Sequence, residues 1–336
     1  MKKIFSLAAI ILVFAMVLAA CGGNSGNNAG SNNASGAAAT ESSSPSPSPS
    51  EASEAAAPAE IVVKHELGET TVKTNPSKVV VFDFGSLDTL DKLGVEVASI
   101  PQGNVPAYLE KYKDAKYVNA GTLQEPDFET IDGIEPDLII ISGRQSAHYD
   151  ALTEIAPTIF MGVDTKNYME SFKKNVNTLA EIFGKQAEAE AALAEVEASV
   201  KAVNEKATGA GSNGLIILSN EGKISAFGSG SRFGIIHDVL GITPVDPSIQ
   251  VDTHGNEASF EFVAEKNPDY LFVVDRNAVV GGNATAKDSI ENDLVKNTNA
   301  FKDGNIVYLD PQYWYLSGGG LISVSEMVAE IGAALE

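Results

Sequence analysis

Short apolar runs alternate with amphipathic stretches along most of the chain. Residues 78–82 form a near-continuous apolar run, which is typical of a strand buried on both faces of a sheet. Residues 86–93 then follow a helical pattern that ends at Gly94, a residue type that commonly stops helices. This alternation predicts an α/β fold with parallel-rich sheets. Further strands are predicted at 61–63 and 70–72, which suit a hairpin, and at 95–100, 137–141, 158–160, 215–218, 223–227, 270–274 and 306–309.

The stretch from 169 to 206 has a different pattern. It contains no proline, is rich in Ala, Glu and Lys, and has one interior glycine, Gly184. It therefore predicts a long helix, bent or broken at Gly184. An ordinary surface helix is the alternative, but the length and the mid-chain position favour a rigid connection between two lobes. We expect an N-terminal lobe at 60–167, a linker helix at 168–208 and a C-terminal lobe at 209–336.

An internal repeat supports the two-lobe interpretation. Residues 128–144 align without a gap with residues 260–276, at a constant offset of 132. The pairs Phe-Glu and Pro-Asp, four apolar residues and a terminal arginine recur in both segments. Each copy predicts a short helix, a turn and a buried strand that leads to a loop with an arginine, Arg144 or Arg276. Two duplicated, Rossmann-like α/β lobes explain this pattern better than chance does.

Charge and composition exclude some functions. The chain has 336 residues, with 45 Asp and Glu against 23 Lys and Arg, and a formal net charge of −22. Such an acidic protein lacks the basic face that nucleic-acid binding requires, so we expect no nucleic-acid partner. Only three of the 23 cationic residues are arginines: Arg144, Arg232 and Arg276.

All three arginines follow a predicted strand. In open parallel sheets, ligands bind beyond the carboxyl ends of the strands, so two facing lobes would place the arginines in one cleft. The alternative for any one of them is a surface ion pair. Because a guanidinium binds anionic oxygens bidentately and stays charged, the three together predict a pocket for a bulky, polyanionic small ligand.

Four other residues are weaker candidates for this pocket. Trp314 and Tyr315 follow the last predicted strand and add aromatic surface, and Phe84 and Ser86 follow the first buried strand. Packing in the core or at the rim is the alternative for the aromatic pair. His254, in a polar loop, is a further residue that could reach a ligand.

The sequence offers little for catalysis or metal binding. The four histidines are scattered without the spacing of a zinc site, and the single cysteine cannot form a thiolate cluster. No G-x-S-x-G elbow occurs, and the glycine-rich segment 228–230 has Phe233 where a dinucleotide fingerprint needs its last glycine. These residues therefore give no starting point for catalysis, although they do not exclude an enzyme.

The N-terminus has the pattern of an export signal. Two lysines precede the apolar run 4–20, which is typical of a secretory signal peptide and short for a membrane span. The run ends in Leu-Ala-Ala followed by Cys21, the pattern at which bacterial signal peptidase cuts before a cysteine that then carries lipid. We expect 1–20 to be removed and 21–59, rich in Gly, Asn, Ser and Ala, to be a disordered tether. The lipid would hold the protein at the outer face of the cell membrane; a plain signal peptide with an accidental cysteine is the alternative.

The cysteine motif, the paired lobes, the long helix and the repeated Glu…Pro-Asp…strand segment together resemble the periplasmic-binding-protein family that serves iron-siderophore and vitamin B12 ABC importers. The resemblance covers residue 61 to the end. It implies two lobes joined by one rigid helix, with a ligand cleft between them. Four segments resemble, more narrowly, family members that bind petrobactin, a catecholate–citrate siderophore whose ferric complex is a bulky anion: 81–90, 137–144, 223–228 and 314–320.

The resemblance also implies partners. The chain would capture an anionic ferric siderophore and deliver it to an ABC permease dimer, with Glu129 and Glu261 pairing with permease arginines. Both glutamates occupy equivalent places in the internal repeat, although a solvated surface acid is the ordinary role for most of the 45 acidic residues. Because the siderophore would hold the iron, we expect no protein metal ligand, no cofactor and no enzyme activity, and the protein would be a monomer. A receptor for heme or a corrinoid, and an enzyme that processes iron-siderophores, are the alternatives.

Overall fold

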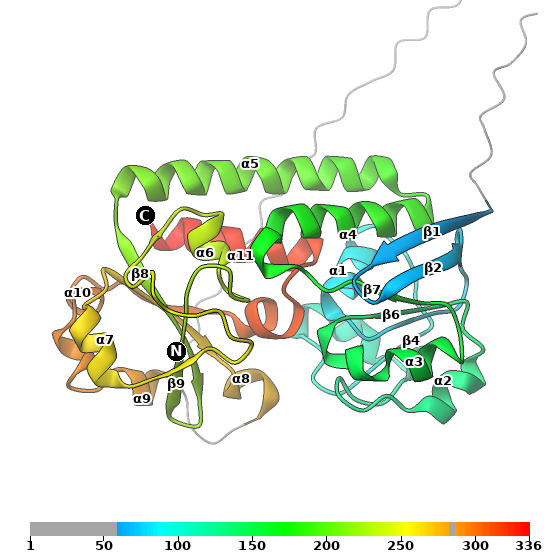
Figure 1. Ribbon diagram of the computed structural model, residues 1–336, viewed down its shortest axis with the longest axis horizontal. Coiled ribbons are helices and arrows are strands. Elements are labelled where there is room, and N and C mark those ends of the chain that lie inside the picture. The colour runs from blue at the N-terminus through cyan, green and yellow to red at the C-terminus, as the bar shows by residue number, and fades with distance from the viewer. Residues whose placement is uncertain (1–58, 282–285) are drawn as a thin grey trace, which may run out of the picture. The chain divides into compact units, whose positions relative to one another are not determined.

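The computed structural model describes residues 59–281 and 286–336. The predicted signal peptide, Cys21 and the tether up to residue 58 lie outside the described residues. In the part that is described, no helix has both the length and the hydropathy that crossing a membrane requires. The elements form two β-sheets with flanking helices and a separate hairpin, which confirms the α/β class (Figure 1).

The N-terminal part is built on a five-stranded sheet in which every neighbouring pair is parallel. In order across the sheet, the strands are β5 (Val118–Asn119), β4 (Ser99–Ile100), β3 (Val79–Val81), β6 (Leu138–Ile141) and β7 (Thr158–Phe160). The predicted hairpin is confirmed as the antiparallel pair β1 (Glu60–His65) and β2 (Gly68–Lys73). The helices are α1 (Phe84–Lys92), η1 (Ala107–Lys113), α2 (Phe128–Ile134), η2 (Gly143–His148), α3 (Tyr149–Thr153) and η3 (Thr165–Asn167). The strand predicted at 95–100 is reduced to its last two residues, because only these pair with β3 and β5.

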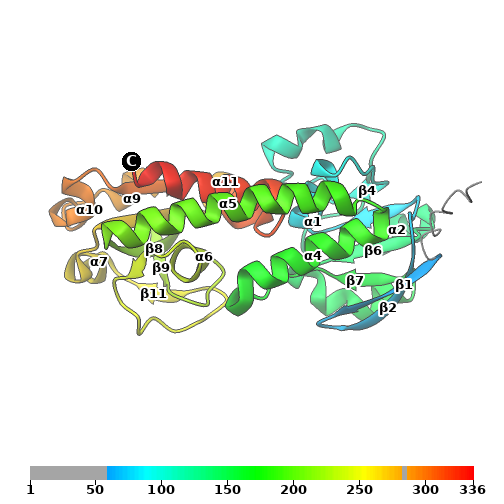
Figure 2. The ribbon, with the colours of Figure 1, turned by 90° about the horizontal axis from the view of Figure 1, so that it is seen from above.

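Two helices connect the two parts where the sequence predicts one long helix. α4 (Tyr168–Phe183) ends at Gly184, which adopts a left-handed conformation (φ 64°) and donates its N–H to the Ala180 carbonyl. α5 (Gln186–Ala210) then runs for 25 residues along both parts (Figures 1 and 2). The sequence is compatible with either a bend or a break of the helix at Gly184. The structure has a break, because a left-handed residue ends a right-handed helix.

The C-terminal part has a mixed sheet. β12 is parallel to both its neighbours, β8 and β13, whereas β9 is antiparallel to β8 and to β11. The strand order is β11 (Asn256–Ala258), β9 (Lys223–Phe227), β8 (Asn213–Asn220), β12 (Tyr270–Asp275) and β13 (Ile306–Leu309), and β10 (Thr243–Pro244) also pairs with β8. The helices are α6 (Ile235–Asp238), α7 (Phe260–Lys266), α8 (Asn277–Val280), α9 (Ala286–Ile290), η4 (Val295–Asn297), α10 (Asn299–Lys302), the short π-helix η5 (Gln312–Ser317) and α11 (Leu321–Ala334).

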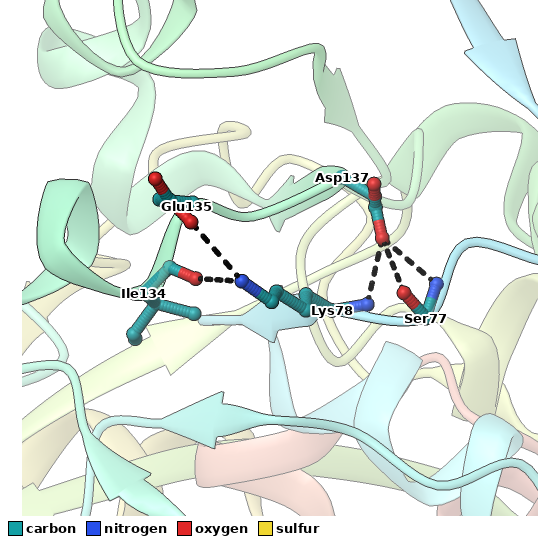
Figure 3. A network of polar contacts seen from close by, with 5 residues as sticks. All are labelled: Ser77, Lys78, Ile134, Glu135 and Asp137. Carbon is teal, nitrogen blue, oxygen red and sulfur yellow. Dashed lines mark hydrogen bonds and ion pairs between the residues drawn. The ribbon is translucent and has the colours of Figure 1, made fainter.

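The Pro-Asp pair of the internal repeat ties the beginnings of neighbouring strands together. Asp137 Oδ2 accepts hydrogen bonds from the N–H groups of Ser77 and Lys78 (3.0 Å each) and from the Ser77 hydroxyl (2.7 Å), just before β3 (Figure 3). The Lys78 ammonium donates to the Ile134 carbonyl (2.9 Å) and lies 3.5 Å from the Glu135 carboxylate. Asp137 therefore fixes the start of β3 beside β6.

The second copy of the repeat does the same in the C-terminal part. Asp269 Oδ2 accepts hydrogen bonds from the N–H (3.1 Å) and the side-chain amide (2.8 Å) of Asn213, at the start of β8. The helices that precede the two pairs, α2 and α7, both end at a left-handed residue, Glu135 and Asn267. Helix, turn and strand are thus equivalent in the two copies, which supports duplication of the lobe.

After β13 the chain returns to the N-terminal sheet. Leu316, in η5, is buried in the core that β3, β6 and α1 form. Leu93, at the end of α1, belongs in turn to the core that α4, α5, α6 and α11 share. α11 packs against both α1 and α5. The two parts are therefore joined by shared packing as well as by α5, and η5 lies where they meet.

Candidate functional site

The three arginines of the chain meet at one residue, Tyr315. Arg144 donates to the carbonyl oxygens of Tyr315 (2.7 Å) and Leu316 (3.3 Å). Arg232 donates to the same Tyr315 oxygen (3.1 Å), and Arg276 Nε donates to the Tyr315 hydroxyl (2.9 Å). The guanidinium carbons lie 4.7 to 5.9 Å from the centre of the Tyr315 ring, within cation–π range. The structure thus brings together the residues that their rarity had singled out.

Each arginine reaches Tyr315 from a different element. Arg144 lies in η2 directly after β6, and Arg276 directly follows β12, as the rule for parallel strands predicts. The same reasoning is wrong for Arg232, because β9 is antiparallel to β8 and ends toward the amino end of that strand. Loop 228–234, rather than the direction of its strand, carries Arg232 to Tyr315.

Neighbouring side chains hold Tyr315 in place. Trp314 is buried, and its indole N–H donates to Glu330 Oε2 on α11 (2.5 Å). Leu316 packs into the N-terminal core on the other side. Tyr315 stays partly exposed between these two anchors. The π-helical turn therefore presents one aromatic side chain and its carbonyl oxygen to the arginines.

The arginine cluster carries positive charge that no carboxylate of the described residues pairs with directly. Within 59–281 and 286–336, every ion pair uses a lysine as its cation. Burial and the charge of Arg144 lower the pKa of Arg232 to about 10, so its guanidinium remains charged at neutral pH. Like charges held this close favour the binding of an anion between them.

A pocket of about 390 Å³ opens beside Tyr315. Arg144 and Arg232 line it, together with Tyr315. Arg276 is not among its lining residues and contacts the cluster through the Tyr315 hydroxyl. Other lining residues come from both parts of the molecule and include Asp83, Ser142, Tyr168, Val251, Asp252 and Thr253. A ligand in this pocket would contact both lobes and two guanidinium groups.

The remaining sequence candidates have other surroundings. Phe84 has no exposed surface and packs in the N-terminal core, so the expectation of ligand contact there is corrected: its position at the start of α1 turns it inward. The Ser86 hydroxyl is buried and donates to Asp83 Oδ2 (2.8 Å), which caps α1. Trp314 lines the pocket but is only 2% exposed. His254 is exposed and does not line the pocket.

Several wall residues were missed from the sequence, Asp83 and Tyr168 among them. Tyr168 is buried, lines the pocket, and has a hydroxyl group for which the described residues provide no hydrogen-bond partner. Burial raises the pKa of that hydroxyl, and the charge of Arg232 opposes the shift. Asp83 was detectable as an acid directly after a buried strand, whereas Tyr168 is in a helical pattern that carries no such signal. Burial raises the pKa of Asp83, whereas the hydrogen bonds from Ser86 and the positive charge of Arg144 act to lower it.

Asp88 ties α1 to the start of α11. It is fully buried and accepts hydrogen bonds from the N–H groups of Ile322 (3.2 Å) and Ser323 (3.0 Å). The Tyr108 hydroxyl lies 3.1 Å from Asp88 Oδ2 and 2.6 Å from the Ser317 hydroxyl in η5. Burial raises the pKa of Asp88 to about 7, although these hydrogen bonds oppose the shift. A titratable group therefore lies at the junction between the N-terminal part and η5.

Replacing Asp88 with asparagine is expected to change how stability depends on pH. Between its ordinary pKa of 3.8 and about 7, the folded protein binds one proton more than the unfolded chain, so this group lowers the free energy of unfolding by about 1.4 kcal/mol per pH unit as the pH rises. Asparagine resembles the protonated acid and does not titrate. Urea unfolding at several pH values from 5 to 8 should show Asp88→Asn gaining stability relative to the wild type up to about pH 7 and no further above it. A difference that stays constant over this range would mean that Asp88 titrates normally.

Glu129 and Glu261 occupy equivalent places on the two parts. Each is the second residue of a short helix, α2 or α7, whose preceding residue caps the helix: Asp127 and Ser259. Both glutamates are exposed, and neither lines the arginine pocket. Hydrogen bonds from its own N–H and from Ser259 lower the pKa of Glu261, which keeps it ionised. The pair presents one negative charge on each part, away from the pocket.

The described residues contain no group of three or more His, Cys, Asp and Glu side chains placed to hold a metal ion. A pocket with arginines, a partly exposed tyrosine and walls from two α/β lobes defines a ligand-binding protein. The sequence matches the periplasmic binding protein family model over residues 79–313, and the chain belongs to that family.

Individual relatives agree with this assignment. The petrobactin-binding protein YclQ of Bacillus subtilis (strain 168) is 47% identical over the full length of both chains. The crystal structure of YclQ matches with a TM-score of 0.81 at 51% identity, covering 82% of this chain and 99% of that one. The structure of VctP, the periplasmic catecholate-siderophore binding protein of Vibrio cholerae, matches with a TM-score of 0.79 at 38% identity and covers 82% and 99% of the two chains. These relatives are binding proteins, and this chain is a substrate-binding protein and not an enzyme.

Proposed function

We propose that this protein is the substrate-binding lipoprotein of an ABC importer and that it captures an anionic ferric siderophore of the catecholate type, similar to petrobactin. The observation that carries the proposal is the convergence of the three arginines on Tyr315, with Arg144 and Arg232 lining the pocket. A ferric catecholate complex has several anionic oxygens around one centre, which suits two guanidinium groups that form no ion pair with any carboxylate of the described residues. The names of YclQ and VctP support the same class of ligand.

The surrounding parts complete the proposed role. Cys21 would carry the lipid and residues 21–59 would tether the body, so that the monomer works at the extracytoplasmic face of the cell membrane. Glu129 and Glu261 would dock the two lobes on the permease dimer, because each is exposed on an equivalent helix of its lobe. The iron would stay inside the siderophore, and the protein would need no cofactor of its own.

A binding titration tests the proposal. Trp314 is the single tryptophan of the chain and lies next to Tyr315, so a ferric complex in the pocket should quench its fluorescence. Purified protein would be titrated with ferric petrobactin, hemin and cobalamin. We expect saturable quenching by ferric petrobactin, at micromolar concentration or below, and recovery of the siderophore chemically unchanged. Saturation by hemin or cobalamin alone would identify the protein as a heme or corrinoid receptor instead. If none of the three ligands gave saturable quenching, the proposal would be overturned.

A further inference from the structure

Arg144 and Arg232 in the pocket wall account for the binding of an anion but not for selectivity between different anions. A guanidinium group binds carboxylate, phenolate and phosphate oxygens alike. Selection must therefore come from other parts of the wall. Residues 251–253 form one such part, in the loop between β10 and β11.

Val251 presents an apolar side chain to the pocket. It is 52% exposed. Four other large apolar side chains are exposed in the described ranges, and none of them lines this pocket: Val62, Val118, Leu294 and Tyr308. Exposed apolar surface inside a binding pocket usually marks a place where a ligand packs.

Val251 is also held in place. Its Cγ2 atom would lie only 3.3 Å from a Cβ at Gly230, and Ile249 Cβ would lie 3.2 Å from one at Gly228. The loop therefore packs on the segment that carries Arg232. That segment is in turn bound to the N-terminal part, because the Thr165 hydroxyl donates to the Gly230 carbonyl (2.7 Å). Val251 thus has a defined position relative to the arginines.

Asp252 adds a negative charge to the same wall. It is exposed, and its Oδ1 accepts a hydrogen bond from the His254 N–H (2.8 Å). None of the lysines or arginines in the described residues forms an ion pair with it. An unpaired carboxylate in the pocket repels any anionic group of a ligand that extends toward it.

We propose that Val251 and Asp252 form a selectivity lip. Val251 packs against the apolar edge of an aromatic ring of the ligand, while the anionic oxygens around the iron lie at the arginines. Asp252 disfavours iron chelates whose arms all end in carboxylates. This inference rests on the proposed function, because it selects among ferric chelates that the arginines would otherwise accept.

The test compares two iron chelates: ferric petrobactin, which has aromatic catecholate arms, and ferric citrate, whose ligand bears carboxylates and a hydroxyl group but no aromatic ring. Full-length wild type, Val251→Ser and Asp252→Asn would be titrated with both by fluorescence quenching. We expect Val251→Ser to bind ferric petrobactin about 5-fold more weakly, because apolar contact is lost, with ferric citrate unchanged. We expect Asp252→Asn to bind ferric citrate about 5-fold more tightly, because a repulsive charge is removed. Val251→Leu, which keeps the apolar surface, should retain affinity for ferric petrobactin.

Matched controls change the same side-chain types away from the pocket. Val118→Ser, on the exposed strand β5, and Asp303→Asn, at the end of α10, should bind both chelates like the wild type. If Val251→Ser changed the affinity for both chelates equally, or if Asp252→Asn did not bind ferric citrate more tightly, the proposed selectivity lip would be rejected. The proposed function would stand in either case. A wild type that binds neither chelate would overturn the proposed function and the lip together.

Discussion

Replacing both Arg144 and Arg232 with glutamine is expected to reduce the affinity for ferric petrobactin at least 100-fold. Each guanidinium can donate charge-assisted hydrogen bonds to an anionic ligand, and such a bond typically contributes about 1.5–3 kcal/mol. Losing one such bond at each arginine therefore raises the dissociation constant by more than about 100-fold. Glutamine keeps a polar, uncharged amide at each position but lacks the terminal Nη atoms that donate to the Tyr315 carbonyl. Fluorescence titration at low and moderate salt measures the effect, and the wild type should lose affinity with added salt more steeply than the double variant.

Arg276 provides the matched control. It lies beside the same tyrosine but does not line the pocket, and its Nη1 already donates to Asn220 Oδ1 (3.0 Å). Arg276→Gln should therefore weaken binding about 10-fold or less, by loosening the Tyr315 hydroxyl rather than by removing a ligand contact. The double variant should also unfold within a few degrees of the wild type, because two like charges are removed along with their hydrogen bonds. Wild-type affinity in the double variant would place the ligand elsewhere.

Charge reversal at both Glu129 and Glu261 is expected to block uptake without affecting binding. The two glutamates are exposed and lie outside the pocket, so their replacement by lysine should leave the affinity for the siderophore unchanged. If they pair with permease arginines, two lysines at these positions produce like-charge repulsion, which typically costs several kcal/mol at an interface. Transport of radioactive iron by cells that produce the variant should fall at least about 10-fold.

The same two helices supply the control for this experiment. Asp132 in α2 and Glu265 in α7 are exposed acids on the same elements, and Asp132→Lys with Glu265→Lys changes the net charge by the same amount. This control pair should transport normally. Equal loss of transport in both pairs would attribute the effect to net charge, and normal transport in the Glu129 and Glu261 variant would reject the docking role.

Several elements could be predicted from the sequence almost to the residue. The strands β7, β9 and β13 have the bounds that their apolar runs predict, because each run is bordered by polar or turn-forming residues. The prediction at 95–100 was too long, since strand pairing depends on which neighbours are available and not on apolarity alone. Gly184 shows the same limit: its presence signalled an interruption, but the left-handed backbone that breaks the helix is visible only in the structure.

The candidate site was predictable in its chemistry and not in its geometry. The rarity of arginine pointed to Arg144, Arg232 and Arg276, because three such residues in an acidic chain of 336 stand out in composition alone. Their common contact could not be predicted, since Tyr315 lies 171, 83 and 39 residues away from them along the chain. Local patterns also could not show that Phe84 faces the core.

The sequence by itself determined the α/β class, the duplicated segment, the unusual arginines and the export-signal pattern, because each is encoded in residue types or in local periodicity. Only the tertiary structure decided that β9 is antiparallel, that Tyr315 is the common partner of the arginines, and that Val251 and Asp252 join the pocket wall. The physical reason is that periodicity reports which face of an element is buried. Which distant side chains meet depends instead on how whole elements pack against one another, and η5 lies where both lobes meet.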